Sequence, residues 1–287
     1  MYPAEFSYQR ATSVQDAIAL LTKEPDAKML AGGQSLLSLM KLRLASPSTL
    51  VDLGGVKELR GIRREGDTIA IGAMTTHREI EFSNELKAAC PILPEAAALI
   101  GDPLVRNRGT IGGSVAHADP AADFPAVLLA LDATIQVEGS KGRRTIAAGD
   151  FFLGLFETAL QPDELLTGIS VPAAQPAGTG MAYEKFPHPA SRYAIVGVAA
   201  IVRVDGGVCR AARVAITGAA SHAMRLPSLE AALVGKPLDG ATLTAACANV
   251  IAPDDLLSDQ FASSEYRAHL VSVLSRRALT RAAARAA

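Results

Sequence analysis

Two glycine pairs stand where the chain could surround an anion. The first, Gly32-Gly33, follows a short apolar run at 27–30 and precedes a leucine-rich segment at 35–44. Consecutive glycines between a strand and a helix let backbone N–H groups converge on an anion, because no Cβ blocks its approach. The helix that follows adds unpaired N–H groups, and the hydroxyl of Ser35 could cap it or donate to a phosphate oxygen. A tight turn before a capped helix would account for the segment equally well.

The second pair, Gly112-Gly113, has the same design. Thr110 and Ser114 flank it, two arginines precede it, and a helical pattern follows. Together the pairs suggest two loops that close on a pyrophosphate from both sides. The sequence contains neither GxxxxGK followed by Ser or Thr nor GxGxxG, which disfavours a P-loop and a Rossmann nucleotide site. Any dinucleotide would therefore be held by another architecture.

Asp123 opens the apolar segment FPAVLLAL. The residue is well placed as the N-cap of a helix, with Pro125 in the first turn, where proline is tolerated. The functional alternative is a carboxylate that accepts hydrogen bonds from ribose or ribityl hydroxyls. His117, Asp119 and Asp123 could also be drawn as a metal cluster, but a glycine loop and a cap explain the segment without metal.

Lys185 and Tyr193 lie on either side of the turn PHPASR. Near a flavin, such a pair could neutralise the charge of the reduced ring and cover one of its faces. The structural alternative is a surface lysine and a core tyrosine. Arg277, Arg281 and Arg285 recur every four residues near the C-terminus, which is typical of a solvated helix face or a docking edge.

Composition excludes several other functions. The formal net charge is −1 without a long run of one sign, so we expect no nucleic-acid partner. No apolar run approaches the ~20 residues that cross a bilayer, and the N-terminus does not resemble a secretory signal. Cys90, Cys209 and Cys247 are too few for a four-thiolate iron–sulfur cluster and too scattered for a disulfide framework. We therefore expect a soluble cytoplasmic chain.

The surrounding elements alternate without a strict βαβ rhythm, which favours the α+β class. Ser13 is a candidate N-cap for a helix over 13–22, and prolines within 85–100 predict two helical pieces. Two long strands are expected around Asp205-Gly206-Gly207. The small, breaker-rich stretch 173–180 marks a domain boundary. No HExxH, Ser-His-Asp or Cys-His arrangement is apparent, so we assign no catalytic residue and no metal ligand.

Four segments carry a specific resemblance: AGGQSLLSLMKLRLASPSTLVDL, IGAMTTHREIE, NRGTIGGSVAHADPAADFPA and YAIVGVAA. In this order they resemble the medium, FAD-binding subunit of the xanthine dehydrogenase family, and most of all its carbon monoxide dehydrogenase flavoprotein type. The resemblance covers essentially the whole chain. One departure is Gln34, where related chains often have histidine, but a role for the loop backbone survives that change.

The resemblance implies a vanillyl-alcohol-oxidase-like (PCMH-type) FAD-binding domain over 1–177. It would contain two α+β subdomains, about 1–57 and 58–177, with FAD extended between them. Residues 178–287 would form a C-terminal α+β domain like that of the carbon monoxide dehydrogenase flavoprotein, with a small antiparallel sheet and helices.

The resemblance also assigns residues to FAD. The pyrophosphate loops would be formed by Leu30, Ala31, Gly32, Gly33, Gln34, Ser35 and Leu36, and by Thr110, Ile111, Gly112, Gly113 and Ser114. Asp123 would lie near the ribose or ribityl part and Leu166 near the ring, with Lys185 and Tyr193 beside the isoalloxazine. The FAD would be non-covalent, because nothing places a histidine or cysteine beside the flavin's methyl group.

In such enzymes a large subunit oxidises substrate at a molybdenum cofactor, and a small subunit with 2Fe–2S clusters relays electrons to FAD. Electrons would leave this chain for quinone, NAD or oxygen, within a dimer of heterotrimers. The protein would contribute positioning and electrostatic tuning. The alternative is a self-contained FAD-dependent reductase of the same fold, like UDP-N-acetylenolpyruvoylglucosamine reductase. A non-flavin interaction subunit is disfavoured because both glycine pairs are intact.

Overall fold

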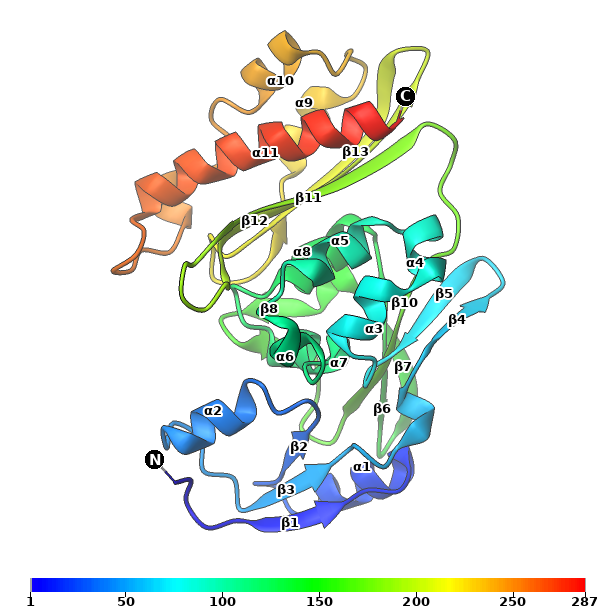
Figure 1. Ribbon diagram of the computed structural model, residues 1–287, viewed down its shortest axis with the longest axis vertical. Coiled ribbons are helices and arrows are strands. Elements are labelled where there is room, and N and C mark those ends of the chain that lie inside the picture. Colours follow the sequence, from blue (N-terminus) through cyan, green and yellow to red (C-terminus); the bar gives the residue numbers. More distant parts are fainter. Residues whose placement is uncertain (1, 287) are drawn as a thin grey trace.

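The structure, a computed structural model, describes residues 2–286 and has three main β-sheets arranged along its longest axis (Figure 1). Helices pack on or between these sheets, and the sheets are parallel or antiparallel without βαβ alternation through the chain. The expected α+β class is therefore confirmed. No helix within residues 2–286 is long and apolar enough to cross a membrane.

The N-terminal sheet is small and parallel, with the strand order β1-β3-β2. Ser13 caps its first helix by accepting the N–H of Asp16, which confirms the predicted N-cap. Val14, Ile18 and Val51 lie in the core beneath the sheet. The elements are β1 (Ser7–Arg10), α1 (Val14–Lys23), β2 (Lys28–Leu30), α2 (Leu36–Lys41), β3 (Thr49–Asp52) and the 3-10 turn η1 (Lys57–Leu59).

The middle sheet is antiparallel, with the order β4-β5-β10-β6-β7. Its strands are β4 (Ile62–Glu65), β5 (Thr68–Gly72), β6 (Thr134–Gly139), β7 (Gly142–Ala147) and β10 (Leu165–Pro172). The 3-10 turn η2 (Ala148–Asp150) leads into a separate hairpin of β8 (Phe152–Gly154) and β9 (Glu157–Thr158). The sheet supplies the base on which the helices of this region pack.

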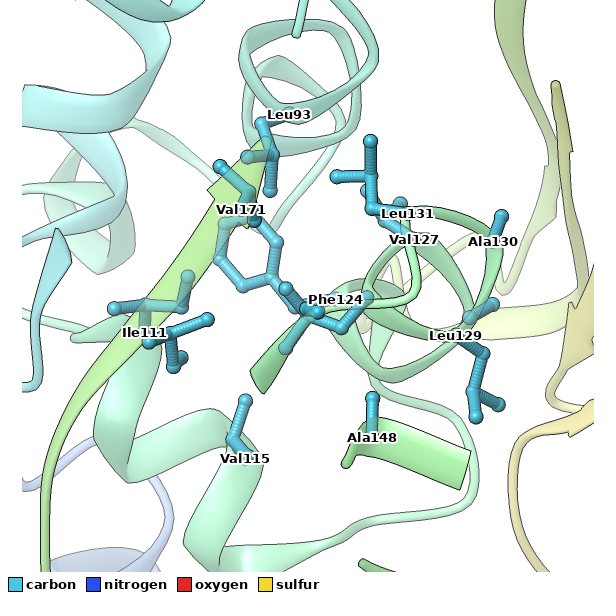
Figure 2. Packing of buried hydrophobic residues seen from close by; sticks show 14 of the residues in the cluster. Leu93, Ile111, Val115, Phe124, Val127, Leu129, Ala130, Leu131, Ala148 and Val171 are labelled. Carbon is cyan, nitrogen blue, oxygen red and sulfur yellow. The ribbon is translucent and has the colours of Figure 1, made fainter. Parts of the chain in front are cut away.

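Six short helices accompany the middle sheet: α3 (His77–Phe82), α4 (Asn84–Ala89), α5 (Ile92–Ala98), α6 (Pro103–Arg106), α7 (Ile111–His117) and α8 (Asp123–Ala130). The break between α4 and α5 falls at Cys90-Pro91, as the prolines predict. Every residue of α8 is buried, which suits a helix that is apolar on all faces. Figure 2 shows Phe124 of α8 packed among side chains that include Leu93, Ile111 and Val171.

The C-terminal sheet is antiparallel, with the order β11-β12-β13-β14. Its two long central strands turn at Gly206 and Gly207, whose φ angles of 59° and 76° suit glycine, and the predicted hairpin is confirmed. The elements are β11 (Thr179–Pro187), β12 (Ala194–Asp205), β13 (Val208–Thr217), β14 (Met224–Arg225), α9 (Pro227–Leu233), α10 (Gly240–Ala246), the 3-10 turn η3 (Pro253–Asp255) and α11 (Ser264–Ala286).

The long helix α11 runs across β11 and β12 (Figure 1). A Cβ on Gly180 of β11 would lie 1.9 Å from the carbonyl oxygen of Ala282, so this glycine permits the close approach. The three arginines, expected on a solvated face or a docking edge, do not behave alike. Arg281 and Arg285 keep side-chain exposures of 41% and 42% but form ion pairs with Glu95 of α5, whereas Arg277 is exposed.

Candidate functional site

The two glycine loops lie against each other. A Cβ on Gly32 would approach the carbonyl oxygen of Arg108 to 2.1 Å, so only glycine permits this contact between the loops. On the other side, a Cβ on Gly113 would stand 3.6 Å from the Cβ of Ala31. The first loop joins β2 to α2, and the second leads into α7. The fold thus brings together two motifs that are far apart in the sequence.

The first loop presents free backbone donors. Within residues 2–286, the N–H groups of Gly32, Gly33, Gln34 and Ser35 donate no hydrogen bond. Gly33 has a φ of 74°, a conformation that favours glycine. The Ser35 side chain makes no capping hydrogen bond to α2, so the capped-helix interpretation of this hydroxyl is wrong. Adjacent N–H groups without an acceptor suit an anion such as a pyrophosphate.

The loop's outer residues frame these donors. Leu30 ends β2, and its carbonyl accepts the N–H of Leu53 at 3.0 Å. Leu36 begins α2 and is partly buried, while Gln34 between them is exposed. Because the Gln34 side chain is exposed, the loop fixes the position of this residue's backbone only.

The second loop differs from the first, although the sequence suggests one design. Its N–H groups are already bound: Ile111 donates to the Thr75 carbonyl at 3.0 Å and Gly112 to the Ala73 carbonyl at 2.9 Å. The N–H of Gly113 donates to the Thr110 hydroxyl at 3.1 Å, which makes Thr110 the N-cap of α7. This loop therefore supplies close packing rather than free donors.

Gly112 explains that packing. A Cβ at this position would lie 2.6 Å from the Cβ of Ala73, at the end of β5. Ser114, one turn into α7, is partly buried, and its hydroxyl is the polar side-chain group that the second loop leaves for a ligand.

Asp123 is not the N-cap of α8. It lies in the first turn, Ala122 occupies the cap position, and no side-chain capping bond forms. The carboxylate instead accepts hydrogen bonds from the Tyr183 hydroxyl at 2.7 Å and from Lys185 Nζ at 2.9 Å. Lys185 Nζ also donates to the Leu99 carbonyl at 3.1 Å. The capping prediction fails because these donors from β11 reach the carboxylate inside the protein.

This polar cluster is buried. The side chains of Lys185 and Asp123 are only 2% and 5% exposed, so the surface-lysine alternative is wrong. Burial raises the pKa of Asp123, and the nearby Lys185 opposes that shift. Burial likewise lowers the pKa of Lys185, against the effect of Asp123. Burial and the Asp123 charge raise the pKa of Tyr183 well above its usual value. Removing either member of a buried ion pair leaves the other as an uncompensated buried charge, so the stability of this pair depends on both partners.

Tyr193 lies at the end of the turn between β11 and β12. Tyr193 is 41% exposed, so the core-tyrosine alternative is wrong. The covered part of the side chain and the charge of Asp119 raise the pKa of Tyr193, while a hydrogen bond with Ser35 lowers it. The Tyr193 carbonyl accepts the N–H of His188 at 2.7 Å, which closes the turn. Tyr193 therefore reaches from the C-terminal sheet to the first glycine loop.

Leu166 is buried, at 3% exposure, in the core of the middle sheet. It precedes a bulge in β10, between Leu166 and Gly168, where the pairing with β6 shifts. Because the side chain is occupied by core packing, any contact with a ligand would come from the backbone at the bulge.

Two residues near the site carry no sequence prediction. Tyr183 completes the Asp123 cluster, and its spacing of two from Lys185 on a strand is the signal that places both on one face. His77 is buried, donates its backbone N–H to the Gly109 carbonyl at 2.9 Å, and lies 5.2 Å from the ring of Phe124. Burial, with Arg106 second, lowers the pKa of His77 to about 4.

No group of three or more metal-ligating side chains occurs in the described part of the chain. The His117, Asp119 and Asp123 combination does not assemble, because Asp123 is bound to Tyr183 and Lys185. All three cysteines are free and buried.

Comparisons with known proteins cover nearly the whole chain. Residues 4–174 match the family described as the FAD binding domain in molybdopterin dehydrogenase, and residues 181–282 match the carbon monoxide dehydrogenase flavoprotein C-terminal domain. The carbon monoxide dehydrogenase medium chain of Hydrogenophaga pseudoflava is 43% identical over 100% of both chains. A 6-hydroxypseudooxynicotine dehydrogenase complex subunit alpha of Paenarthrobacter nicotinovorans is 40% identical, covering 100% and 97%.

A solved structure shows the same fold. A chain of carbon monoxide dehydrogenase from Hydrogenophaga pseudoflava superposes with a TM-score of 0.95, at 44% identity and with full coverage of both chains. The similarity therefore extends through all three sheets and the loops between them.

Proposed function

The chain belongs to the FAD-binding medium subunits of the carbon monoxide dehydrogenase and xanthine dehydrogenase family of molybdenum hydroxylases, and from this we propose that it binds FAD non-covalently and passes electrons from a partner's iron–sulfur clusters to an external acceptor. It is thus an oxidoreductase subunit. Bound FAD would supply the one- and two-electron transfer chemistry. The chain's own residues bind and orient the cofactor.

The free donors of the first loop carry the proposal. Four adjacent N–H groups, from Gly32 to Ser35, have no acceptor within the described residues, and the loop is only partly buried. A pyrophosphate bound there would accept these hydrogen bonds. Gly113 and the Ser114 hydroxyl would border it on the other side. In this arrangement Leu30, Ala31 and Leu36 hold the first loop, while Thr110 and Ile111 hold the second.

We assign Lys185 and Tyr193 to the isoalloxazine side of the site. Lys185 would place a positive charge near the ring and favour the negative charge that the ring carries on reduction. Tyr193 would cover a face of the ring. Asp123 holds the lysine in place and would lie near the ribityl part, and the bulge at Leu166 would contact the ring edge.

The break between β10, which ends at Pro172, and β11, which begins at Thr179, supports the assignment of two domains. We assign 1–177 to the FAD-binding domain, with subdomains at about 1–57 and 58–177, and 178–287 to the C-terminal domain. FAD would lie between the subdomains. Three buried, free cysteines support a non-covalent cofactor.

We propose that the molybdenum cofactor and the 2Fe–2S clusters belong to large and small partner subunits, in a dimer of heterotrimers. Relatives of nearly equal similarity are named for carbon monoxide and for 6-hydroxypseudooxynicotine, which supports substrate selection by another chain. The acceptor would be quinone, NAD or oxygen. A self-contained reductase is disfavoured because residues 181–282 match the carbon monoxide dehydrogenase flavoprotein C-terminal domain.

Reconstitution tests this proposal. The purified chain, co-expressed with its small and large partners, should contain FAD and should reduce an artificial acceptor only when both partners are present. Substrate-dependent reduction by this chain alone would contradict the division of labour and favour the self-contained reductase.

A further inference from the structure

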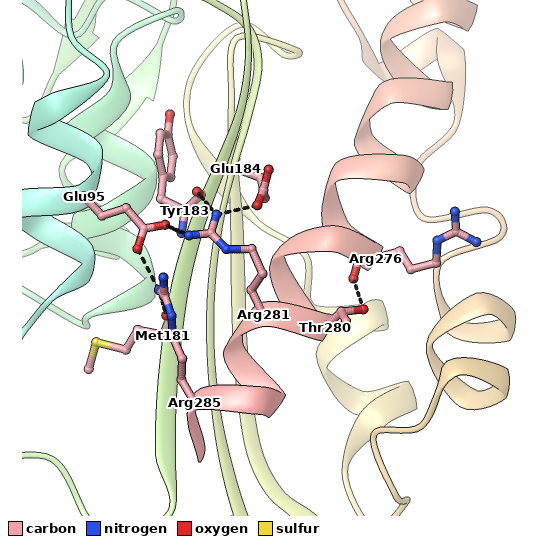
Figure 3. A network of polar contacts seen from close by, with 8 residues as sticks. All are labelled: Glu95, Met181, Tyr183, Glu184, Arg276, Thr280, Arg281 and Arg285. Atoms are coloured by element: carbon pink, nitrogen blue, oxygen red, sulfur yellow. Dashed lines mark hydrogen bonds and ion pairs between the residues drawn. The ribbon is translucent and has the colours of Figure 1, made fainter. Parts of the chain in front are cut away.

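The strand that carries Lys185 is at the edge of its sheet. Within residues 2–286, β11 pairs with β12 on one side only, so its outer backbone groups have no strand partner there. Side chains from two other elements bind these groups (Figure 3). Glu95 of α5 accepts the N–H of Tyr183 at 3.1 Å, and Arg281 of α11 donates to the Tyr183 carbonyl at 3.1 Å. Arg285 donates to the Met181 carbonyl at 2.6 Å.

The same side chains also bind one another. Each oxygen of the Glu95 carboxylate pairs with one arginine, Arg281 and Arg285, at 2.6 Å in both cases. Arg281 forms a further ion pair with Glu184 of β11. We call Glu95, Arg281 and Arg285 the edge cluster. It fixes α5, α11 and the free edge of β11 to each other through charge-assisted hydrogen bonds.

The edge cluster and the Asp123 cluster share one strand. Tyr183, whose backbone is held by the edge cluster, donates its hydroxyl to Asp123. Lys185 is two residues further along, on the same face of β11, and also reaches Asp123. Lys185 Nζ keeps both of its partners, Asp123 and the Leu99 carbonyl, only while β11 lies at this position relative to the middle region.

We propose that Glu95, Arg281 and Arg285 are positioning residues for the flavin site, which hold β11 in the register that places Lys185 Nζ at Asp123 and beside the isoalloxazine. The inference rests on the proposed FAD site. Within residues 2–286, the edge cluster makes no hydrogen bond to either glycine loop. Without Glu95, the Tyr183 N–H would lose its acceptor and two guanidinium groups would lose their counter-charge, so the edge of β11 would shift or loosen.

The midpoint reduction potential of bound FAD tests the proposal in the full-length, FAD-loaded chain. Glu95→Ala removes the edge cluster's acceptor, and Lys185→Met removes the cation assigned to the ring. Glu230→Ala is the matched control. Glu230 of α9 likewise accepts a strand N–H, from Val214 at 2.8 Å, and pairs with an arginine, Arg225, at 2.6 Å. It belongs to the same C-terminal region, and within the described residues its hydrogen bonds and ion pair go to Val214 and Arg225, not to β11.

We expect Lys185→Met and Glu95→Ala both to lower the midpoint potential, and the double variant to match Lys185→Met alone. Glu230→Ala should lower the melting temperature without moving the potential. The inference is overturned if Glu95→Ala keeps the wild-type potential while Lys185→Met shifts it, or if the two shifts add. It is also overturned, with FAD binding left intact, if Lys185→Met shifts nothing. A wild-type chain without FAD would instead refute the proposed function.

A second variant covers the case in which Glu95→Ala does not fold. Glu95→Gln keeps an oxygen for the Tyr183 N–H but removes the charge that pairs with both arginines. Hydrogen exchange of the 181–187 peptide, measured without FAD, should be faster in Glu95→Gln than in the wild type and unchanged in Glu230→Gln. Equal exchange in all three chains would contradict the anchoring of β11 by the edge cluster.

Discussion

At the scale of single residues, the site depends on a buried carboxylate that holds two donors from a different sheet. Asp123 accepts hydrogen bonds from the Tyr183 hydroxyl and Lys185 Nζ in the buried interior of the protein. The sequence locates Asp123 but favours a capping role, because an aspartate before an apolar helix is an ordinary cap. The true partners come from a strand far along the chain, and local sequence contains no information about them.

Removing this carboxylate should be costly. Asp123→Ala leaves Lys185 as an uncompensated buried cation, and we expect a loss of about 3–5 kcal/mol in the free energy of unfolding. The control is Asp132→Ala. Asp132 pairs with Arg213 and Arg225 but is more than half exposed, so its loss should cost no more than about 1 kcal/mol. Denaturant unfolding of both variants checks this, and similar losses would contradict a buried, paired Asp123.

His77 should make stability depend on pH. Its pKa falls from 6.5 to about 4 in the folded chain, so between these values the unfolded chain binds more protons. Stability is therefore complete above pH 6.5 and is lost as the pH falls through this window, by about 3 kcal/mol.

Denaturant unfolding of the wild type and His77→Gln at a series of pH values measures this contribution. Glutamine does not titrate in this range, so the difference between the two proteins isolates His77 from the other groups. As the pH falls, the free energy of unfolding of the wild type should decrease more than that of His77→Gln. Parallel stability curves would show that His77 is not buried in its neutral form.

At the scale of elements, hydrophobic and turn patterns were sufficient for much of the fold. They predict the capped helix α1, the break before α5 and the long hairpin of β12 and β13, all of which the structure has. They also single out both glycine loops. They could not show that one loop has free N–H groups while the N–H groups of the other are bound to residues 73 and 75, because that difference arises from contacts with the segment that follows β5. Helical spacing alone places Arg281 and Arg285 on a solvated face, so the sequence does not show that both arginines pair with Glu95.

The contact between the two loops should tolerate no side chain at Gly32. Gly32→Ala would place a Cβ against the Arg108 carbonyl, forcing the loops apart and costing about 1–3 kcal/mol. It should also weaken FAD retention, measured by the flavin left after gel filtration. Gly149→Ala is the control, because a Cβ there meets nothing within 4 Å. Equal FAD retention in the two variants would contradict loop contact as a requirement of the site.

At the scale of the whole molecule, the candidate site gathers residues from all three sheets. The first loop follows the N-terminal sheet, the second loop and Asp123 belong to the middle region, and Lys185 and Tyr193 come from the C-terminal sheet (Figure 1). A ligand bound there would contact every region of the chain. Folding and cofactor binding should therefore be linked, which the sequence alone suggests only through the family resemblance.

Added FAD should raise the melting temperature of the chain in a concentration-dependent way. At a free concentration 100 times the dissociation constant, the stabilisation should be about 2.7 kcal/mol. Riboflavin, which lacks the pyrophosphate, should stabilise much less because it cannot use the donors of the first loop. Equal effects of FAD and riboflavin would contradict pyrophosphate binding at that loop.

The most direct test of the account is the visible absorption spectrum of the purified chain, repeated on the supernatant after acid precipitation. We predict flavin bands in the protein that move entirely to the supernatant, identified as FAD and in a roughly one-to-one ratio with the chain, as a non-covalent cofactor requires. A colourless chain that also takes up no added FAD, alone or together with its partner subunits, would contradict the central claim.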